Sequence, residues 1–257
     1  MIGNPPWGQT KPPVGYGVDW GDPISRGLVG CWLFNEGAGN KVYDIAKGNT
    51  GTLTNGPLWV PGKLGQTLKF DGASSYVSIG ASDVDAPCSA SMWVYKPALS
   101  SFTSVALFDS SAYSFRGEQY NGTRAVGVTK YGVADYLFSP EYQIPLLTLV
   151  NLTLVISGSV AILYANGVQK GTISGVDIKF PRTDIGRNNP NVFNGLIDNA
   201  RIYNRALSAQ EIMRLYTEPF AGIQTPSRRF ISPAAAGGAA PWANRINNLI
   251  GTGVNVS

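Results

Sequence analysis

The chain has 257 residues, 44% of them hydrophobic and 14% charged, which is enough for one large β domain or two small ones. Its net charge of +4 comes from scattered basic residues, and histidine is absent. These features argue against nucleic-acid binding and exclude Ser-His or Cys-His nucleophile pairs and histidine-bound zinc. The 31 glycines and 17 prolines favour many short strands joined by tight turns over a helical bundle.

Residues 1–24 form the first zone, with five prolines, five glycines and no hydrophobic period. It has no apolar core of a secretory signal. We expect an extended arm. Large aromatic side chains are unfavourable in water, so we expect Trp7, Tyr16 and Trp20 to contact a partner.

Residues 25–220 form a domain of successive short strands, each rich in aromatic or β-branched residues. The expected strands are 28–34, 67–70, 76–79, 90–95, 104–109, 124–129, 147–157 and 160–164. Asn166-Gly167 predicts a tight type I′ hairpin, because both residues tolerate positive φ. The longest apolar stretch, 144–157, is too short and too polar to span a bilayer. Cys31 and Cys88 have no metal-site spacing and are expected to be buried free thiols.

The segment 194–204 predicts a strand with one acid, Asp198, among apolar neighbours. Strict alternation would put Leu196, Asp198, Ala200 and Ile202 on one face, and Ile197, Asn199, Arg201 and Tyr203 on the other. A buried carboxylate needs donors or a cation, which Arg201, Arg205 or backbone N–H groups could supply. A metal ligand and a general acid are the alternatives. The structural role is favoured because no second acid motif stands nearby.

A helix is predicted directly after this strand. Ser208 is the expected N-cap, and Glu211 three residues later completes a capping box. Leu207 and Ile212 occupy the positions of a hydrophobic staple. Pro219 marks the end of the helix.

The third zone, 221–257, is a basic tail with an Ala/Gly/Pro-rich centre and no acidic residue. Such a segment is expected to be ordered only when it lies on its own domain or on a neighbouring chain. The candidate contact residues of this tail are Arg228, Arg229, Trp242 and Arg245.

Four stretches together resemble the laminin-G-like, concanavalin-A-like jelly roll. They are 27–53 with its W-x-F-x-E opening, 62–79 with an F-D-G turn, 162–172, and 185–216 with D-x-x-R-I-Y-N-R-A-L-S. The resemblance covers about 190 residues. It implies an all-β, two-sheet antiparallel sandwich with a short C-terminal helix, flanked here by extended arms.

The resemblance also implies glycan binding, often with calcium at the rim of the sheets. Glu36 and Asp44 match acids of the family's first motif, and Asp71 lies in the F-D-G turn. Calcium takes six to eight oxygens, so Glu36 and Asp44 are candidate ligands. The alternative is that these acids bind their own backbone in turns. Trp59, Tyr131 and Tyr136 are candidate sugar-stacking aromatics, with packing in the core or at the rim as the alternative.

The flanks 12–32 and 215–222 resemble those of such domains in tailed-phage structural proteins. This implies a non-enzymatic virion protein, decorating a capsid or fibre, whose arms hold other virion proteins or copies of itself. It would be made in the host cytoplasm and released in particles, with no nucleic-acid partner or membrane span. A soluble calcium-dependent lectin is the alternative. A glycosidase or lyase on the same fold is disfavoured because it lacks an acid motif and histidine.

Overall fold

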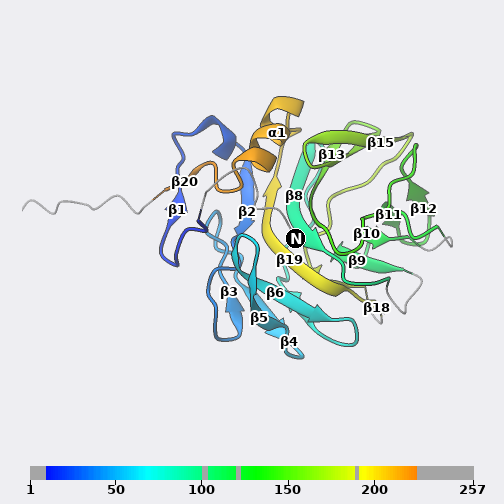
Figure 1. Cartoon of the computed structure of the whole chain (residues 1–257). Helices are drawn as coiled ribbons and strands as arrows, with labels where there is room; N and C mark the ends of the chain where they lie inside the picture. The colour runs from blue at the N-terminus through cyan, green and yellow to red at the C-terminus, as the bar shows by residue number, and fades with distance from the viewer. Residues whose placement is uncertain (1–9, 100–103, 120–122, 189–190, 225–257) are drawn as a thin grey trace, which may run out of the picture. The chain divides into compact units, whose positions relative to one another are not determined.

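The computed structural model describes residues 10–99, 104–119, 123–188 and 191–224. Two eight-stranded antiparallel sheets face each other and make a sandwich, which confirms the predicted jelly-roll class (Figure 1). Within these residues no helix has the length and apolar character needed to cross a membrane.

The first sheet has the order β12-β11-β10-β9-β16-β7-β4-β3. Its strands are β3 (Lys41–Val42), β4 (Gly51–Thr54), β7 (Tyr76–Ser78), β9 (Val105–Asp109), β10 (Tyr113–Glu118), β11 (Gly127–Lys130), β12 (Ala134–Leu137) and β16 (Asp184–Ile185). The order places β9 between β10 and β16, with β11 and β12 completing one edge.

The second sheet has the order β15-β14-β13-β8-β19-β6-β5, and β2 also pairs with β19. Its strands are β2 (Leu28–Trp32), β5 (Leu58–Gly62), β6 (Gly65–Asp71), β8 (Cys88–Tyr95), β13 (Leu149–Ser157), β14 (Val160–Ala165), β15 (Val168–Ser174) and β19 (Asn194–Tyr203). Asn166 (φ 52°) and Gly167 (φ 78°) turn β14 into β15, so the predicted hairpin is confirmed.

The remaining elements are short. They are β1 (Gly17–Val18), the 3₁₀ helix η1 (Pro23–Ser25), β17 (Arg187–Asn188), β18 (Asn191–Val192), α1 (Ala209–Thr217) and β20 (Ile223–Gln224). Ser208 caps α1 through the predicted capping box with Glu211. Leu207 and Ile212 are both buried beneath the helix, as the staple requires.

Two apolar clusters hold the layers together. The larger lies between the sheets and includes Trp32, Phe70, Phe108 and Leu152. The smaller lies under α1 and includes Leu28, Trp93, Tyr203, Ile212 and Leu215. Cys31 and Cys88 are buried free thiols, as expected. The second sheet is therefore covered on both faces where α1 packs, which explains the nearly continuous burial along β8 and β19.

Strand β19 departs from the predicted alternation. Asn199 has φ 44°, and the pairing of β19 with β8 shifts register between Asp198 and Arg201. This bulge places Ile197 in the same inner cluster as Ala200 and Ile202. The predicted assignment of Ile197 to the opposite face was wrong, because one inserted residue reverses every later side chain.

Residues 10–24 run along the domain and add to it. β1 pairs with β20 in the register Gly17↔Gln224, so the two ends of the described chain form a ribbon. Val18 is buried in the cluster under α1. Arg214 of α1 donates from both terminal nitrogens to the Asp22 carboxylate, each at 2.7 Å. Trp20 remains 54% exposed, with the Lys47 ammonium 5.3 Å from its ring centre.

Candidate functional site

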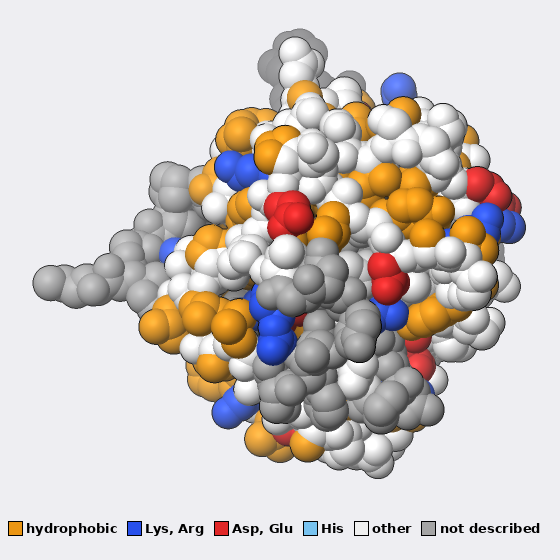
Figure 2. Space-filling view, turned by 90° about the vertical axis from the view of Figure 1, so that its right-hand side faces the viewer, with side chains coloured by type: hydrophobic (Ala, Val, Ile, Leu, Met, Phe, Trp, Pro, Cys, Tyr) orange, Lys and Arg blue, Asp and Glu red, His pale blue; other side chains and the backbone are white. Residues whose placement is uncertain are grey.

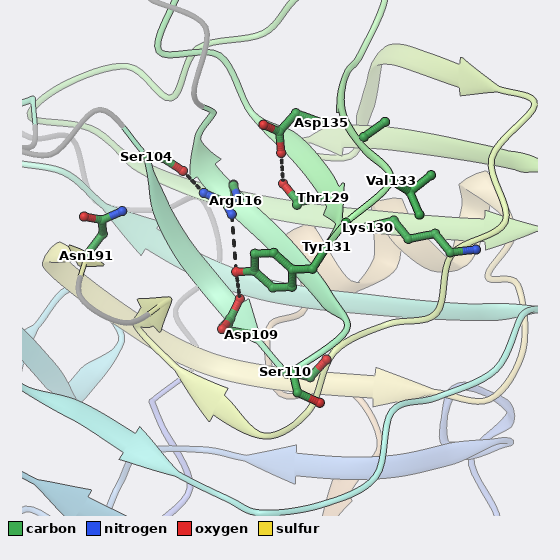
Figure 3. A pocket seen from close by; sticks show the side chains of 13 residues that line it. Ser104, Asp109, Ser110, Arg116, Thr129, Lys130, Tyr131, Val133, Asp135 and Asn191 are labelled. Atoms are coloured by element: carbon green, nitrogen blue, oxygen red, sulfur yellow. Dashed lines mark hydrogen bonds between the residues drawn. The ribbon is translucent and has the colours of Figure 1, made fainter.

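A pocket of about 670 Å³ opens on the first sheet, at the β9–β12 edge (Figure 3). Most of the residues that line it have polar or charged side chains. The residues are Ser104, Asp109, Ser110, Ser111, Arg116, Thr129, Lys130, Tyr131, Gly132, Val133, Ala134, Asp135 and Asn191. Hydroxyl, carboxyl, guanidinium and aromatic groups thus converge in one place.

Strand pairing and one tight turn position the three central side chains of the pocket, those of Asp109, Arg116 and Tyr131. Asp109 is the last residue of β9, paired with Ser114 of β10 and Asp184 of β16. Arg116 lies where the β9–β10 pairing shifts register, opposite Gly127 of β11. Tyr131 begins the β11–β12 turn, and Gly132 (φ 74°) lets that turn close.

The side chains of Arg116, Tyr131 and Asp109 form a hydrogen-bonded chain (Figure 3). Arg116 Nη2 donates to the Tyr131 hydroxyl at 3.3 Å, and that hydroxyl donates to Asp109 Oδ1 at 2.8 Å. Arg116 Nη1 also donates to the Ser104 hydroxyl. The chain fixes the rotamers of all three groups before any ligand arrives.

Burial raises the pKa of the Asp109 carboxyl to about 7, although the Tyr131 hydroxyl and the Arg116 charge oppose the rise. Burial also raises the pKa of the Tyr131 hydroxyl, and the neighbouring Asp109 charge adds to the effect. Asp109 therefore changes its charge near neutral pH, while Tyr131 stays protonated and able to donate.

The rim carries further polar groups. Thr129 Oγ1 donates to Asp135 Oδ1 at 2.5 Å, and Lys130 pairs with Asp177 at 2.8 Å. Figure 2 shows this side of the molecule, where acidic and basic side chains lie interspersed among uncharged ones. Recognition on this face therefore depends on individual groups and not on a broad field of one sign.

The profile of a laminin-G-like family, described as the concanavalin A-like lectin/glucanases superfamily, matches residues 71–213. This is more than half of the chain. The protein belongs to that superfamily.

Solved structures share the fold of this superfamily member. Domain 4 of AbnA, a GH43 extracellular arabinanase from Geobacillus stearothermophilus in complex with arabinotriose, is 21% identical with a TM-score of 0.60. The match covers 74% of this chain and 98% of that domain. The binding domain of Paraclostridial Mosquitocidal Protein 1 is 15% identical with a TM-score of 0.56, over 77% of this chain and 53% of that one.

A sialidase from Trypanosoma rangeli, in complex with sialic acid, is 14% identical with a TM-score of 0.52. That match covers 75% of this chain but 33% of the sialidase. No curated protein sequence matches the chain. Identities this low establish the shared fold alone.

Asp44 and Glu36, the predicted calcium ligands, bind backbone groups. The Asp44 carboxylate accepts from Cys31 N, Ala46 N, Asn49 N and Asn49 Nδ2, at 2.8, 2.9, 3.1 and 2.9 Å. Glu36 Oε1 accepts from Tyr43 N at 2.7 Å, while Oε2 is buried without a partner. No group of three or more His, Cys, Asp or Glu residues suited to a metal occurs in the described ranges. This arrangement does not offer the oxygens calcium takes, and calcium binding stays a prediction.

Asp198 is buried, and its counter-ion is Lys11. Lys11 Nζ also donates to the carbonyls of Phe34 and Gln66. Burial raises the pKa of Asp198 to about 6, against the Lys11 charge, and burial lowers the pKa of Lys11. Of the three predicted kinds of partner, the backbone N–H groups are confirmed, since Asn199 N donates to Asp198, whereas Arg201 and Arg205 were wrong.

Those two arginines have other acceptors. Arg201 binds the carbonyls of Pro219 and Ala221, and Arg205 binds Glu211. The sequence prediction considered arginines close to Asp198 along the chain, whereas its cation, Lys11, lies in the N-terminal segment.

Of the three candidate aromatics, the structure places Tyr131 in the pocket. Trp59 and Tyr136 are partly buried and pack against the inter-sheet cluster. Tyr16 lines a separate 260 Å³ hollow beside Glu36. Trp7, Arg228, Arg229, Trp242 and Arg245 lie outside the described residues.

Sequence reasoning missed Asp109 and Arg116. Their only local signal is a charged residue within a strand, in "SVALFD" and "SFRGE". Such a signal is easily explained as a solvated strand end. Only the pairing of β9, β10 and β11 brings the two residues to one pocket.

Proposed function

We propose that the protein is a carbohydrate-binding module and that the β9–β12 pocket is its binding site. The observation that carries this is the prearranged Arg116–Tyr131–Asp109 chain inside a polar cavity with an aromatic wall. Sugars offer many hydroxyls and one apolar ring face, so they need fixed donors and acceptors beside an aromatic side chain. Membership of a lectin/glucanase superfamily and the arabinotriose complex of domain 4 of AbnA support this proposal.

In this proposal the pocket binds without turnover. Asp109 and Asp135 act as hydrogen-bonding groups toward the sugar and not as an acid–base pair. Chromatographic analysis of each bound oligosaccharide after prolonged incubation tests this. Unchanged oligosaccharides are expected, and the appearance of shortened products would reassign the site as catalytic.

Isothermal titration with a panel of oligosaccharides tests the binding itself. We expect saturable binding that Tyr131→Ala weakens at least tenfold, because the aromatic wall and the bridging hydroxyl are lost together. Tyr43→Ala is the matched control, since Tyr43 is also exposed (52%) but lies outside the pocket. Equal affinities for both variants would place any sugar site elsewhere.

The predicted calcium dependence is tested by repeating the titrations in the presence of EDTA.

The chain ends support a second, finer proposal, that the module is displayed on a tailed-phage virion. The β1–β20 ribbon lies on the opposite side of the sandwich from β11 and β12 (Figure 1). A carrier attached at either end of the described chain would therefore leave the pocket facing outward. The phage-like flanks at 12–32 and 215–222 add to this support.

Light scattering tests the anchoring role of the tail. The full chain is expected to form multimers, and a chain ending at residue 224 is expected to be monomeric. If both are monomers at the same concentration, the tail does not join copies of this chain.

Immunogold labelling of released particles with an antibody against residues 25–220 then tests the virion location, and unlabelled particles would exclude it.

A further inference from the structure

Among the described residues, the Arg116 guanidinium is a buried cation with no carboxylate in direct salt-bridge contact, and the Asp109 carboxyl reaches it only through the Tyr131 hydroxyl. Arg116 is only 6% exposed, although it lines the pocket. All 16 acidic residues of the chain lie within the described ranges. None of the ion pairs that they form includes Arg116. A buried charge in this state is costly and favours an incoming counter-ion.

Other buried cations of the same domain are better satisfied. Lys11 pairs with Asp198, and Lys96 pairs with Glu118 at 2.9 Å. Arg201 has an acceptor at each nitrogen, namely Asn199 Oδ1, Ala221 O and Pro219 O. Arg116 has two hydroxyl partners, and its Nε is buried without an acceptor. The Tyr131 ring, 5.6 Å from Arg116 Cζ, and the Asp109 charge behind the Tyr131 hydroxyl compensate this cation less directly than a carboxylate in contact would.

The free hydrogen-bonding capacity of Arg116 matches a carboxylate. Each terminal nitrogen carries two N–H groups and uses one of them, for Ser104 or Tyr131. The remaining two terminal N–H groups suit a carboxylate, whose two oxygens guanidinium binds in parallel. A neutral sugar hydroxyl accepts hydrogen bonds from Arg116 but brings no negative charge into contact with the guanidinium.

We infer that the pocket selects acidic sugars, those bearing a carboxylate, and that Arg116 binds this carboxylate. The inference rests on the proposed function and specifies its ligand class. Lys130 is less suited to this task because Asp177 already pairs with it.

Asp109 makes this selectivity depend on pH. The groups facing it are Tyr131 of the turn, Arg116 and Ser114 of β10, and Asp184 of β16, which pairs with Arg187 at 2.8 Å. A ligand carboxylate near Arg116 repels the ionised Asp109 and favours its protonated form. Because the pKa of Asp109 is near 7, affinity for acidic sugars rises as pH falls through neutrality.

The experiment is isothermal titration of the full chain with matched pairs. The pairs are trigalacturonate with its methyl ester and sialyllactose with lactose. At least one acidic member is expected to bind about tenfold more tightly than its neutral counterpart. A tenfold difference in affinity has the same free energy as a change of one unit in a pKa. Equal or tighter binding of the neutral members overturns the acidic selectivity and leaves the carbohydrate function standing. Binding of no sugar in either pair or in the wider oligosaccharide panel overturns both.

Variants separate the roles of the two charges. Arg116→Met is expected to remove the preference, so that the acidic and the neutral member of a pair bind this variant with equal affinity. Asp109→Asn is expected to flatten a pH profile that otherwise gains about tenfold in affinity between pH 8.5 and pH 5.5. Both carboxylate probes stay ionised over this range. If Arg116→Met does not fold, a wild-type affinity for the acidic sugar that does not change with pH still contradicts the coupling.

Discussion

The region beside the β1–β20 ribbon and the β9–β12 pocket differ in how completely their charged groups are paired. Beside the β1–β20 ribbon, Lys11 meets Asp198, Arg201 meets two carbonyls and an amide, and Asp22 receives both Arg214 nitrogens. Beside β9–β12, Arg116 has two hydroxyls, and Asp109 has a pKa near 7. These charged groups of the first region receive their partners from their own chain. The second region is incomplete, which is typical of a binding site whose remaining partner is a ligand.

The largest expected effect comes from breaking an ion pair of the first region. Lys11→Met leaves Asp198 as a buried carboxylate without its cation, and should lower the free energy of unfolding by about 3–5 kcal/mol. Adding Asp198→Asn should recover most of that loss, because the uncompensated charge is removed. Urea denaturation of both variants measures this. A Lys11→Met protein as stable as the wild type would mean that the pair contributes no more than an exposed one.

Asp109→Asn should instead raise the free energy of unfolding. The folded pKa of Asp109 is raised, so ionisation penalises the folded state increasingly as pH rises from about 4 to about 7. The variant should therefore be more stable than the wild type at pH 8, on the order of 2 kcal/mol, and equal to it at pH 4. Thermal unfolding at the two pH values tests this. Asp135→Asn is the matched control, since its exposed carboxylate should contribute within about 0.5 kcal/mol.

Ser208→Ala tests the cap of helix α1. Glu211 N loses its side-chain acceptor at 3.3 Å, and the loss should cost about 1 kcal/mol. Circular dichroism followed through urea unfolding measures the change. A loss above about 3 kcal/mol would mean that α1 also fixes the cluster under it.

The smallest effect is expected for Glu211→Gln. The Arg205 guanidinium holds the pKa of Glu211 at about 2, with burial opposing and the Ser208 N–H assisting. A depressed carboxyl pKa stabilises the fold above its unfolded value and loses that contribution as pH falls toward 2. The variant should therefore lower the free energy of unfolding by less than about 1 kcal/mol at pH 7, because solvent screens this partly exposed pair, and by only a small part of that at pH 2, where the folded carboxyl is about half protonated. Urea titrations at both pH values check this, and a difference that persists in full at pH 2 would point to packing.

Local sequence patterns predicted the features that depend on neighbours along the chain. The capping box at Ser208 and the Asn166-Gly167 turn need only a few adjacent residues, and both are confirmed. The spacing of strands and turns predicted a β sandwich, and the resemblance of four stretches to the laminin-G-like family implied the jelly roll. The candidate site was not predictable in this way, because Asp109, Arg116 and Tyr131 meet only through strand pairing and a register shift. Lys11 escaped prediction for the same reason, since it lies 187 positions from Asp198.

The pairing of Gly17 with Gln224 has a consequence for how this domain can be rearranged. Neighbouring entry and exit points let a domain be spliced into a surface loop of another protein, or reconnected with new ends elsewhere, without altering its core. A linker joining residue 10 to residue 224, which keeps Lys11, with the chain reopened at the turn of residues 45–47, would yield a permuted domain with the β9–β12 pocket intact. Inserted into another protein, such a domain would carry the β9–β12 pocket with it.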